Sequence, residues 1–126
     1  MITIEIDDRQ VRFSPFISNI VPILRPPMVR SVARLISDLA SYPPAPPTSR
    51  YRRTGTLGRR WTSETRVTSD SLRGEIGNNT SYGPFVQSSE DQAHMHVGRW
   101  QTDQQVADDN EATIVSDFER AIRAAL

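Results

Sequence analysis

Residues 60–78 read RWTSETRVTSDSLRGEIGN, and they alternate with the period of two β-strands separated by a short turn. If residues 68–71 form a four-residue loop, Val67 lies opposite Leu72 and Trp61 lies opposite Asn78. In that register the alternating positions of both strands share one face of the sheet. The stretch therefore predicts a β-hairpin over about 60–78, with one face turned toward a core.

A further strand is predicted at the N-terminus. Ile2, Ile4 and Ile6 alternate with polar residues, which is the pattern of a half-buried strand. Val11 and Phe13 resume the alternation after Asp-Arg, which can turn the chain, so a second hairpin is expected there.

Helical spacing follows the N-terminal strands. Phe16, Ile20 and Leu24 recur at the spacing of a short helix, which Pro22 should kink or end. A pair of prolines then starts a second helix over about 27–41. The apolar stripe of this helix consists of Met28, Val32, Leu35, Ile36 and Leu39.

The rest of the chain divides into a connector, a loop and a helix. Residues 43–48 hold four prolines, which favour an extended connector, and the alternative is a PxxP-type ligand for an aromatic groove. Residues 88–105 keep no period and predict a long loop. A C-terminal helix is expected over about 109–125, with Asp108 as its cap and Glu111 completing a capping box.

These elements predict one α+β domain over residues 1–126, an antiparallel sheet packed against amphipathic helices. A chain of 126 residues is long enough for one modest core. It contains no Cys, which excludes disulfides and thiolates that act as metal ligands or nucleophiles. It contains no Lys, which excludes a lysine Schiff base.

Charge is balanced in total but separated along the chain. The sequence holds 15 basic and 15 acidic residues, and every basic residue is Arg. Residues 50–73 carry seven Arg against two acids, a net +5, whereas residues 87–119 carry eight acids against one Arg, a net −7. Such blocks can meet on neighbouring subunits, or they can contact each other within one fold or remain solvated.

Catalytic signatures are sparse. His94 and His96 could hold a metal if Glu90, Asp91 or Asp103 supplied a further ligand, but the spacing fits no known metal motif, and exposed or packing histidines in a loop are the favoured explanation. The sequence contains no nucleophile elbow, Walker loop or dinucleotide-binding glycine motif. We therefore expect no enzymatic activity, no cofactor and no resident metal.

Membranes and nucleic acids are not expected as partners. The chain shows no signal-peptide pattern and no apolar run of about 20 residues, so the expected location is the cytoplasm. The alternative function is a small Arg-rich nucleic-acid-binding or ribonuclease-like domain, because guanidinium and aromatic groups lie close together. Zero net charge and the lack of a nucleic-acid-binding motif disfavour it. The residues it would use are Arg52, Arg53, Arg59, Arg60 and Trp61.

Two short elements in the middle of the chain resemble a known family. Residues 53–57 (RTGTL), with Trp61 shortly after, are similar to the TGxL element of HK97 gp10-like phage tail-component proteins. Residues 76–87 (IGNNTSYGPFVQ) resemble the family's strand that leads into a YAxxVE element, with Gly83 in place of Ala and Gln87 in place of the acid. The resemblance covers about residues 28–126.

The resemblance implies a structural role in the virion. Such proteins are small α+β subunits that assemble as rings at the head–tail junction or the end of the tail tube. It implies a homo-oligomeric ring, tail or portal proteins as partners, and a location in the bacterial host cytoplasm during assembly and then in the virion. Candidate interaction residues are Arg52, Arg53, Arg59, Arg60, Trp61, Tyr82, Phe85, Arg99 and Trp100.

Overall fold

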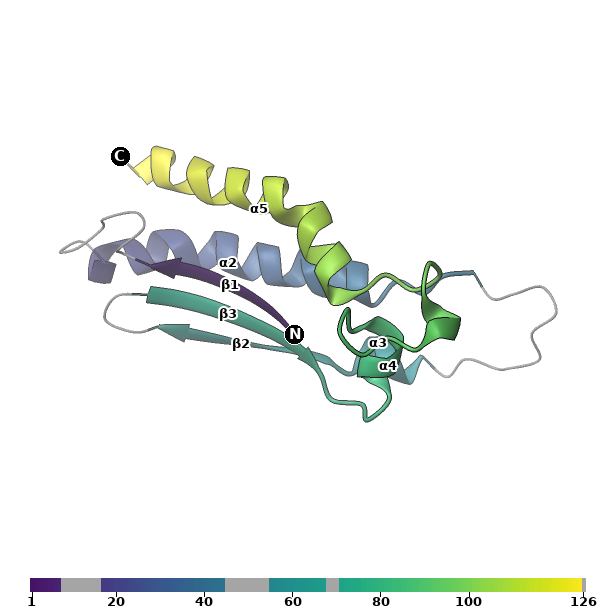
Figure 1. The fold of residues 1–126 in the computed structure, drawn as a ribbon. Coiled ribbons are helices and arrows are strands. Elements are labelled where there is room, and N and C mark those ends of the chain that lie inside the picture. Colours follow the sequence, from purple (N-terminus) through teal and green to yellow (C-terminus); the bar gives the residue numbers. More distant parts are fainter. Residues whose placement is uncertain (8–16, 45–54, 68–70, 126) are drawn as a thin grey trace.

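A computed structural model describes residues 1–7, 17–44, 55–67 and 71–125 of the protein. Two long helices cover one face of a three-stranded antiparallel sheet, and short helices gather at one end (Figure 1). The predicted α+β class, with its antiparallel sheet, amphipathic helices and C-terminal helix, is confirmed.

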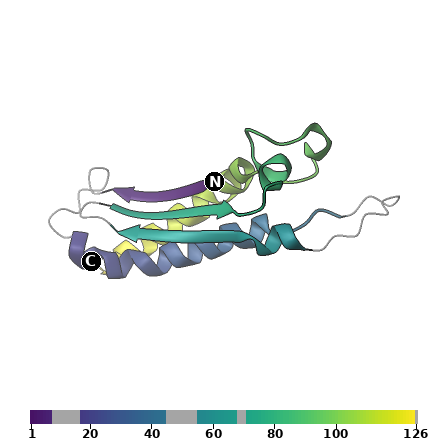
Figure 2. The same ribbon diagram turned by 90° about the horizontal axis from the view of Figure 1, so that it is seen from below.

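The sheet has the strand order β1-β3-β2 (Figure 2). Its strands are β1 (Ile2–Asp7), β2 (Trp61–Val67) and β3 (Ser71–Asn78). The predicted hairpin is confirmed with its register, because Val67 faces Leu72 at the turn end. The loop that closes it, at residues 68–70, lies outside the described residues.

The N-terminal strand forms as expected and pairs with β3. β1 runs antiparallel to β3, and Ile2 faces Ile76 while Ile6 faces Leu72. The second strand predicted at Val11 and Phe13 falls outside the described residues. The isoleucines therefore extend the central hairpin into a larger sheet.

Helix α2 (Ile17–Leu39) corrects the prediction of two helices divided by proline. It is continuous and holds Pro22, Pro26 and Pro27 in its interior, although an interior proline typically costs about 3 kcal/mol. Leu24 belongs to the same buried stripe as the later apolar residues, so continuing the helix keeps it in the core. The helix ends at Leu39, before the predicted stop near residue 41, and the connector from residue 45 to residue 48 lies outside the described residues.

Helix α5 (Asp103–Ala125) begins six residues earlier than predicted. Its capping box is Thr102 and Gln105, not Asp108 and Glu111. The backbone N–H of Gln105 donates to Thr102 Oγ1 at 3.1 Å, and the N–H of Thr102 donates to Gln105 Oε1 at 2.9 Å. Asp108 therefore lies one turn inside the helix, where it is exposed.

The core lies between the sheet and the two helices. Helix α2 packs on β3 and β2, whereas α5 packs on α2 and on β1. At the centre of the sheet Gly74 lies beneath α2, and a Cβ there would be 2.7 Å from Met28 Sδ. The largest fully buried apolar side chains are Leu24, Met28, Leu35, Leu39, Leu72, Ile76 and Val106.

Candidate interaction surfaces

The TGxL-like element forms a turn into the short helix α3 (Thr56–Arg59). Gly55 has a φ of 78°, a left-handed conformation that favours glycine, and a Cβ there would also lie 2.9 Å from Arg59 Nη1. Leu57 is buried and anchors the element, while Arg59 and Arg60 are exposed just before β2. Arg52 and Arg53 lie outside the described residues.

Asn78, which was not among the predicted interaction residues, clamps this turn to the end of β3. Its side-chain amide donates to the Leu57 carbonyl at 2.9 Å, and its Oδ1 accepts from the Thr80 N–H at 3.0 Å. Beside it, Trp61 is half-buried against the core, and its indole Nε1 is buried without a hydrogen-bond partner. Trp61 is therefore mainly a packing residue at the start of β2.

Tyr42 brings three distant segments together at the end of the molecule. Its ring meets that of Trp100 edge-on, with centroids 5.0 Å apart, and its hydroxyl accepts from the Gly58 N–H at 2.9 Å. Trp100 also lies 6.4 Å from the ring of His96. Burial, together with the charge of the exposed Arg99, lowers the pKa of His96. Trp100, predicted as an interaction residue, is thus part of an internal aromatic cluster.

The predicted loop over residues 88–105 is largely built around two glutamines. Gln87, only 2% exposed, donates through Nε2 to the carbonyls of Leu39 and Gln101 at 3.0 and 3.2 Å. Gln92 Nε2 donates to the carbonyls of Val86 and Trp100 at 2.7 and 3.0 Å. A short 3₁₀ helix, η1 (His94–His96), lies within this segment, which corrects the expectation of a loop without regular structure.

Tyr82 immediately precedes helix α4 (Gly83–Gln87) and is 45% exposed. Phe85 lies within α4. In the part of the chain that the structure describes, no three His, Asp or Glu side chains form a group that could hold a metal ion. His94 is exposed and His96 half-buried.

The face of the sheet opposite the helices is polar and charged. Glu5, Arg73 and Arg66 form one row across the three strands, and Thr3, Glu75 and Glu64 form the next. Arg73 donates to Glu5 at 2.9 Å, and this hydrogen bond raises the pKa of Arg73. On the β2 side, Arg66 faces the like-charged Arg73 but donates to Glu64 of its own strand at 3.1 Å, and this hydrogen bond raises the pKa of Arg66.

Charges of opposite sign lie near the two opposite edges of the sheet, basic residues at the β2 edge and acidic residues at the β1 edge. On the β2 side, Arg59 and Arg60 precede the strand and Arg66 lies within it. On the β1 side, α5 and the strand line an open groove of about 300 Å³ whose walls include Asp108 and Glu111. Most of the remaining lining is apolar: Ile2, Ile4, Leu35, Ala107, Ile114 and Val115.

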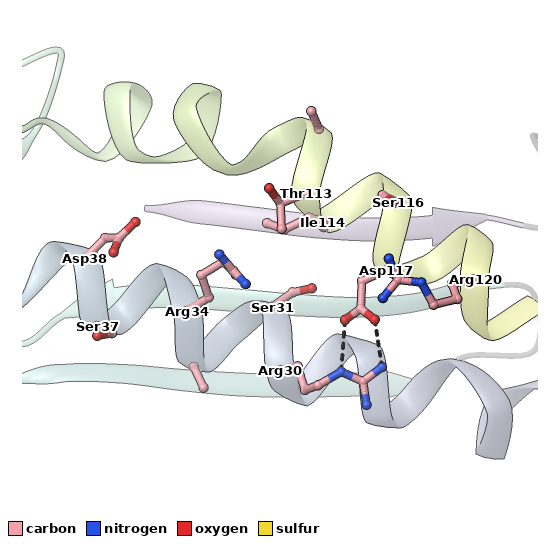
Figure 3. Close-up of a pocket in the computed structure, with 12 residues that line it drawn as sticks. Arg30, Ser31, Arg34, Ser37, Asp38, Thr113, Ile114, Ser116, Asp117 and Arg120 are labelled. Atoms are coloured by element: carbon pink, nitrogen blue, oxygen red, sulfur yellow. Dashed lines mark hydrogen bonds and ion pairs between the residues drawn. The ribbon is translucent and has the colours of Figure 1, made fainter.

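A second, polar groove of about 950 Å³ runs between α2 and α5 (Figure 3). Arg30 donates from Nε and Nη2 to both carboxylate oxygens of Asp117, at 3.0 and 2.8 Å. This hydrogen-bonded pair lowers the pKa of Asp117, and the charges of Arg120 and Arg34 lower it further. The lining combines the guanidinium groups of Arg30, Arg34 and Arg120 with the carboxylates of Asp38 and Asp117, so the groove carries charges of both signs.

Comparison of the chain with protein-family models, curated proteins and solved structures finds no match. Among the described residues, no helix combines the length and the apolar character needed to cross a membrane.

Proposed function

We propose that this protein is a structural subunit of a tailed phage or prophage, a tail-completion or head–tail connector protein. It acts by assembling into a ring with copies of itself and by contacting tail or portal proteins, not by catalysis. Assembly takes place in the cytoplasm of the bacterial host, and the ring becomes part of the virion. The resemblance of the TGxL-like and Tyr82-containing elements to HK97 gp10-like proteins motivates this proposal.

The observation that carries the proposal is the separation of charge between the two sides of the sheet. A head-to-tail contact uses two different patches of each subunit and closes into a ring when the rotation allows. A basic β2 side and an acidic β1 side are such a pair, and opposite charges favour one orientation of approach. In this reading the charge balance of the chain reflects complementarity between copies.

The alternative of a nucleic-acid-binding or ribonuclease-like domain has less support from the described residues. Trp61 packs against the core and Trp100 against Tyr42, so both rings are engaged in internal contacts. Base stacking by proteins uses free aromatic faces. A gel shift with single-stranded RNA and with duplex DNA at low salt tests the alternative directly, and retention with a steep salt dependence would support it.

The proposed role is tested in the phage or prophage genome that carries the gene. After its deletion and induction, electron microscopy should show DNA-filled heads and tails that do not join, and a plasmid copy of the gene should restore joined particles. A Gly77→Ala copy serves as a control, since a Cβ at that position meets nothing within 4 Å. Joined, infectious particles from the deletion strain would refute the role.

A further inference from the structure

The sheet of this subunit ends in two edge strands of unlike sequence. Within the described part of the chain, β3 is central, so β1 and β2 each expose one row of backbone hydrogen-bonding groups. Proteins usually protect such edges with prolines, bulges or charged side chains. β1 (ITIEID) and β2 (WTSETRV) contain no Pro or Gly, and they carry charged side chains, Glu5 on β1 and Glu64 and Arg66 on β2, which oppose unselective pairing. Both strands run antiparallel to β3 and hence parallel to each other.

The cross-strand rows define where a further strand would fit. Glu5 is paired with Arg73, which is paired in turn with Arg66. In the neighbouring core-facing row, Ile6 is paired with Leu72 and Leu72 with Val67. If the β1 strand of a second copy continued these rows beyond β2, its Glu5 would lie beside Arg66, and its Ile6 beside Val67.

Several side chains favour this register over its neighbours. Arg66 donates to Glu64 of its own strand at 3.1 Å, and its remaining N–H groups can donate to a carboxylate on its open side. Val67 is 44% exposed and would be covered by an isoleucine. A shift by one residue would turn the isoleucines to the solvent face, and a shift that brings Glu5 beside Glu64 would oppose like charges.

Charge beyond the strands agrees with the same arrangement. Asp103, the first residue of α5, accepts a hydrogen bond from the Met1 ammonium at 2.8 Å, so the start of α5 lies beside the start of β1. In the continued register Thr62 lies beside Met1 of the next copy, so Arg60 of one copy and the start of α5 in the next lie at the same end of the contact. Asp108 and Glu111 follow along α5, beside Ile2 and Ile4.

We propose that the partner of the β2 edge is the β1 edge of a second copy of this chain, added in parallel with Arg66 beside Glu5 of the second copy. Repetition of this contact joins the sheets of successive subunits. The inference rests on the proposed function only in assuming that the contact serves ring assembly. The contact itself can be tested with the purified protein, without any phage.

Cysteine cross-linking tests the register, and the chain has no native cysteine to interfere. Thr3 and Glu64 lie in one row with β3 between them, so their Cα atoms within a chain are about 9.5 Å apart. A disulfide requires less than about 7 Å, so the Thr3→Cys/Glu64→Cys variant cannot close one internally. In the proposed contact the two cysteines of adjacent copies are direct neighbours.

Oxidation of that double variant should give a ladder of dimers, trimers and larger species on a non-reducing gel. Each single variant can give dimers at most. The matched control is Thr3→Cys/Glu119→Cys, because Glu119 is an exposed residue near the end of α5. A ladder no stronger than that of the control would overturn the proposal.

Charge reversal tests the Arg66–Glu5 contact by sedimentation velocity at low salt. Glu5→Arg and Arg66→Glu should each weaken self-association about tenfold or more, whereas their 1:1 mixture and the double reversal should restore it. The matched controls Glu119→Arg and Arg123→Glu reverse an exposed pair on α5 and should leave association unchanged. If Arg66→Glu abolished self-association while Glu5→Arg had no effect, the β2 strands of two copies would pair with each other, and the proposal would be overturned.

The outcomes separate this inference from the proposed function. Rings of wild-type protein without the cross-linked ladder would mean that the ring uses another surface, and the proposed function would stand. A ladder and charge rescue, combined with joined particles from the deletion strain, would retain the edge contact and refute the phage role.

Discussion

The contact between α2 and the centre of the sheet can be tested with two glycines of one strand. A Cβ added at Gly74 would lie 2.7 Å from Met28 Sδ and 3.2 Å from Val32 Cγ2, whereas a Cβ at Gly77 meets nothing within 4 Å. Met28 is fully buried, so its side chain has little space into which to move. We therefore compare the stability of a Gly74→Ala variant with that of Gly77→Ala, which serves as its matched control.

The expected difference in the free energy of unfolding between the two variants follows from two opposing effects. Replacing Gly by Ala restricts the unfolded chain and stabilises a compatible site by about 0.4–1 kcal/mol. Overpacking a filled core costs about 1–3 kcal/mol. Because the first effect is common to both variants, Gly74→Ala should be less stable than Gly77→Ala by about 1–3 kcal/mol.

Urea denaturation followed by circular dichroism measures this difference, since both variants should keep the wild-type m-value. In thermal scans the difference should be about 4–12 °C in Tm. Adding Met28→Val removes the clashing sulfur, so Gly74→Ala should cost less free energy of unfolding in that background. Equal stabilities of the two alanine variants would refute the packing of α2 on β3 described above.

Three further predictions concern contacts that the fold reveals. Thr102→Ala should lower the free energy of unfolding by about 1 kcal/mol, because it removes half of a capping box, whereas Asp108→Ala should change it by less than about 0.5 kcal/mol; urea denaturation distinguishes the two. Burial by itself would raise the pKa of Asp103, but hydrogen bonds and the nearby ammonium outweigh it and lower that pKa. The Asp103 carboxylate therefore stabilises the fold above its unfolded pKa of about 3.9, and this contribution is lost as pH falls through the folded value. Asp103→Asn should accordingly be less stable than wild type at pH 7, with the gap closing in acid, and equal stabilities at pH 7 would contradict this. Tyr42→Phe removes the acceptor of the Gly58 N–H and should cost about 1 kcal/mol, measured as a lower Tm; an unchanged Tm would show that this bond contributes nothing.

Much of the sheet was predictable from local pattern. The period-2 alternation on either side of the turn predicts the β2–β3 hairpin and its register, because a one-residue slip would turn Leu72 and Ile76 out of the core. The prolines in α2 led to a wrong prediction. Local rules favour a break at each of them, but α2 is one continuous helix, and this keeps Leu24 and Met28 buried in the core. At α5, two capping patterns lie six residues apart, and Thr102 and Gln105 form the observed box.

The candidate surfaces depend more strongly on tertiary structure. Trp100 has the residue type of a contact residue, yet the fold places it against Tyr42, 58 positions earlier in the chain. Gln92 gave no signal in the sequence, and Gln87 stood out there only as a departure from the family's acid, because a buried amide that bonds distant carbonyls leaves no local pattern. The basic segment around residues 59–66 was visible in the sequence, but its position on an edge strand was not.

By itself, the sequence determined the α+β class, the hairpin register, the C-terminal helix and the separation of a +5 block from a −7 block. These features are local, since alternation, helical spacing and charge can be read within a few neighbouring residues. Only the tertiary structure decided that β1 pairs with β3 and leaves β2 as the opposite edge. Strand order is set by contacts between residues far apart in the chain, and it places Arg66 on one edge strand while Asp108 and Glu111 lie beside the other.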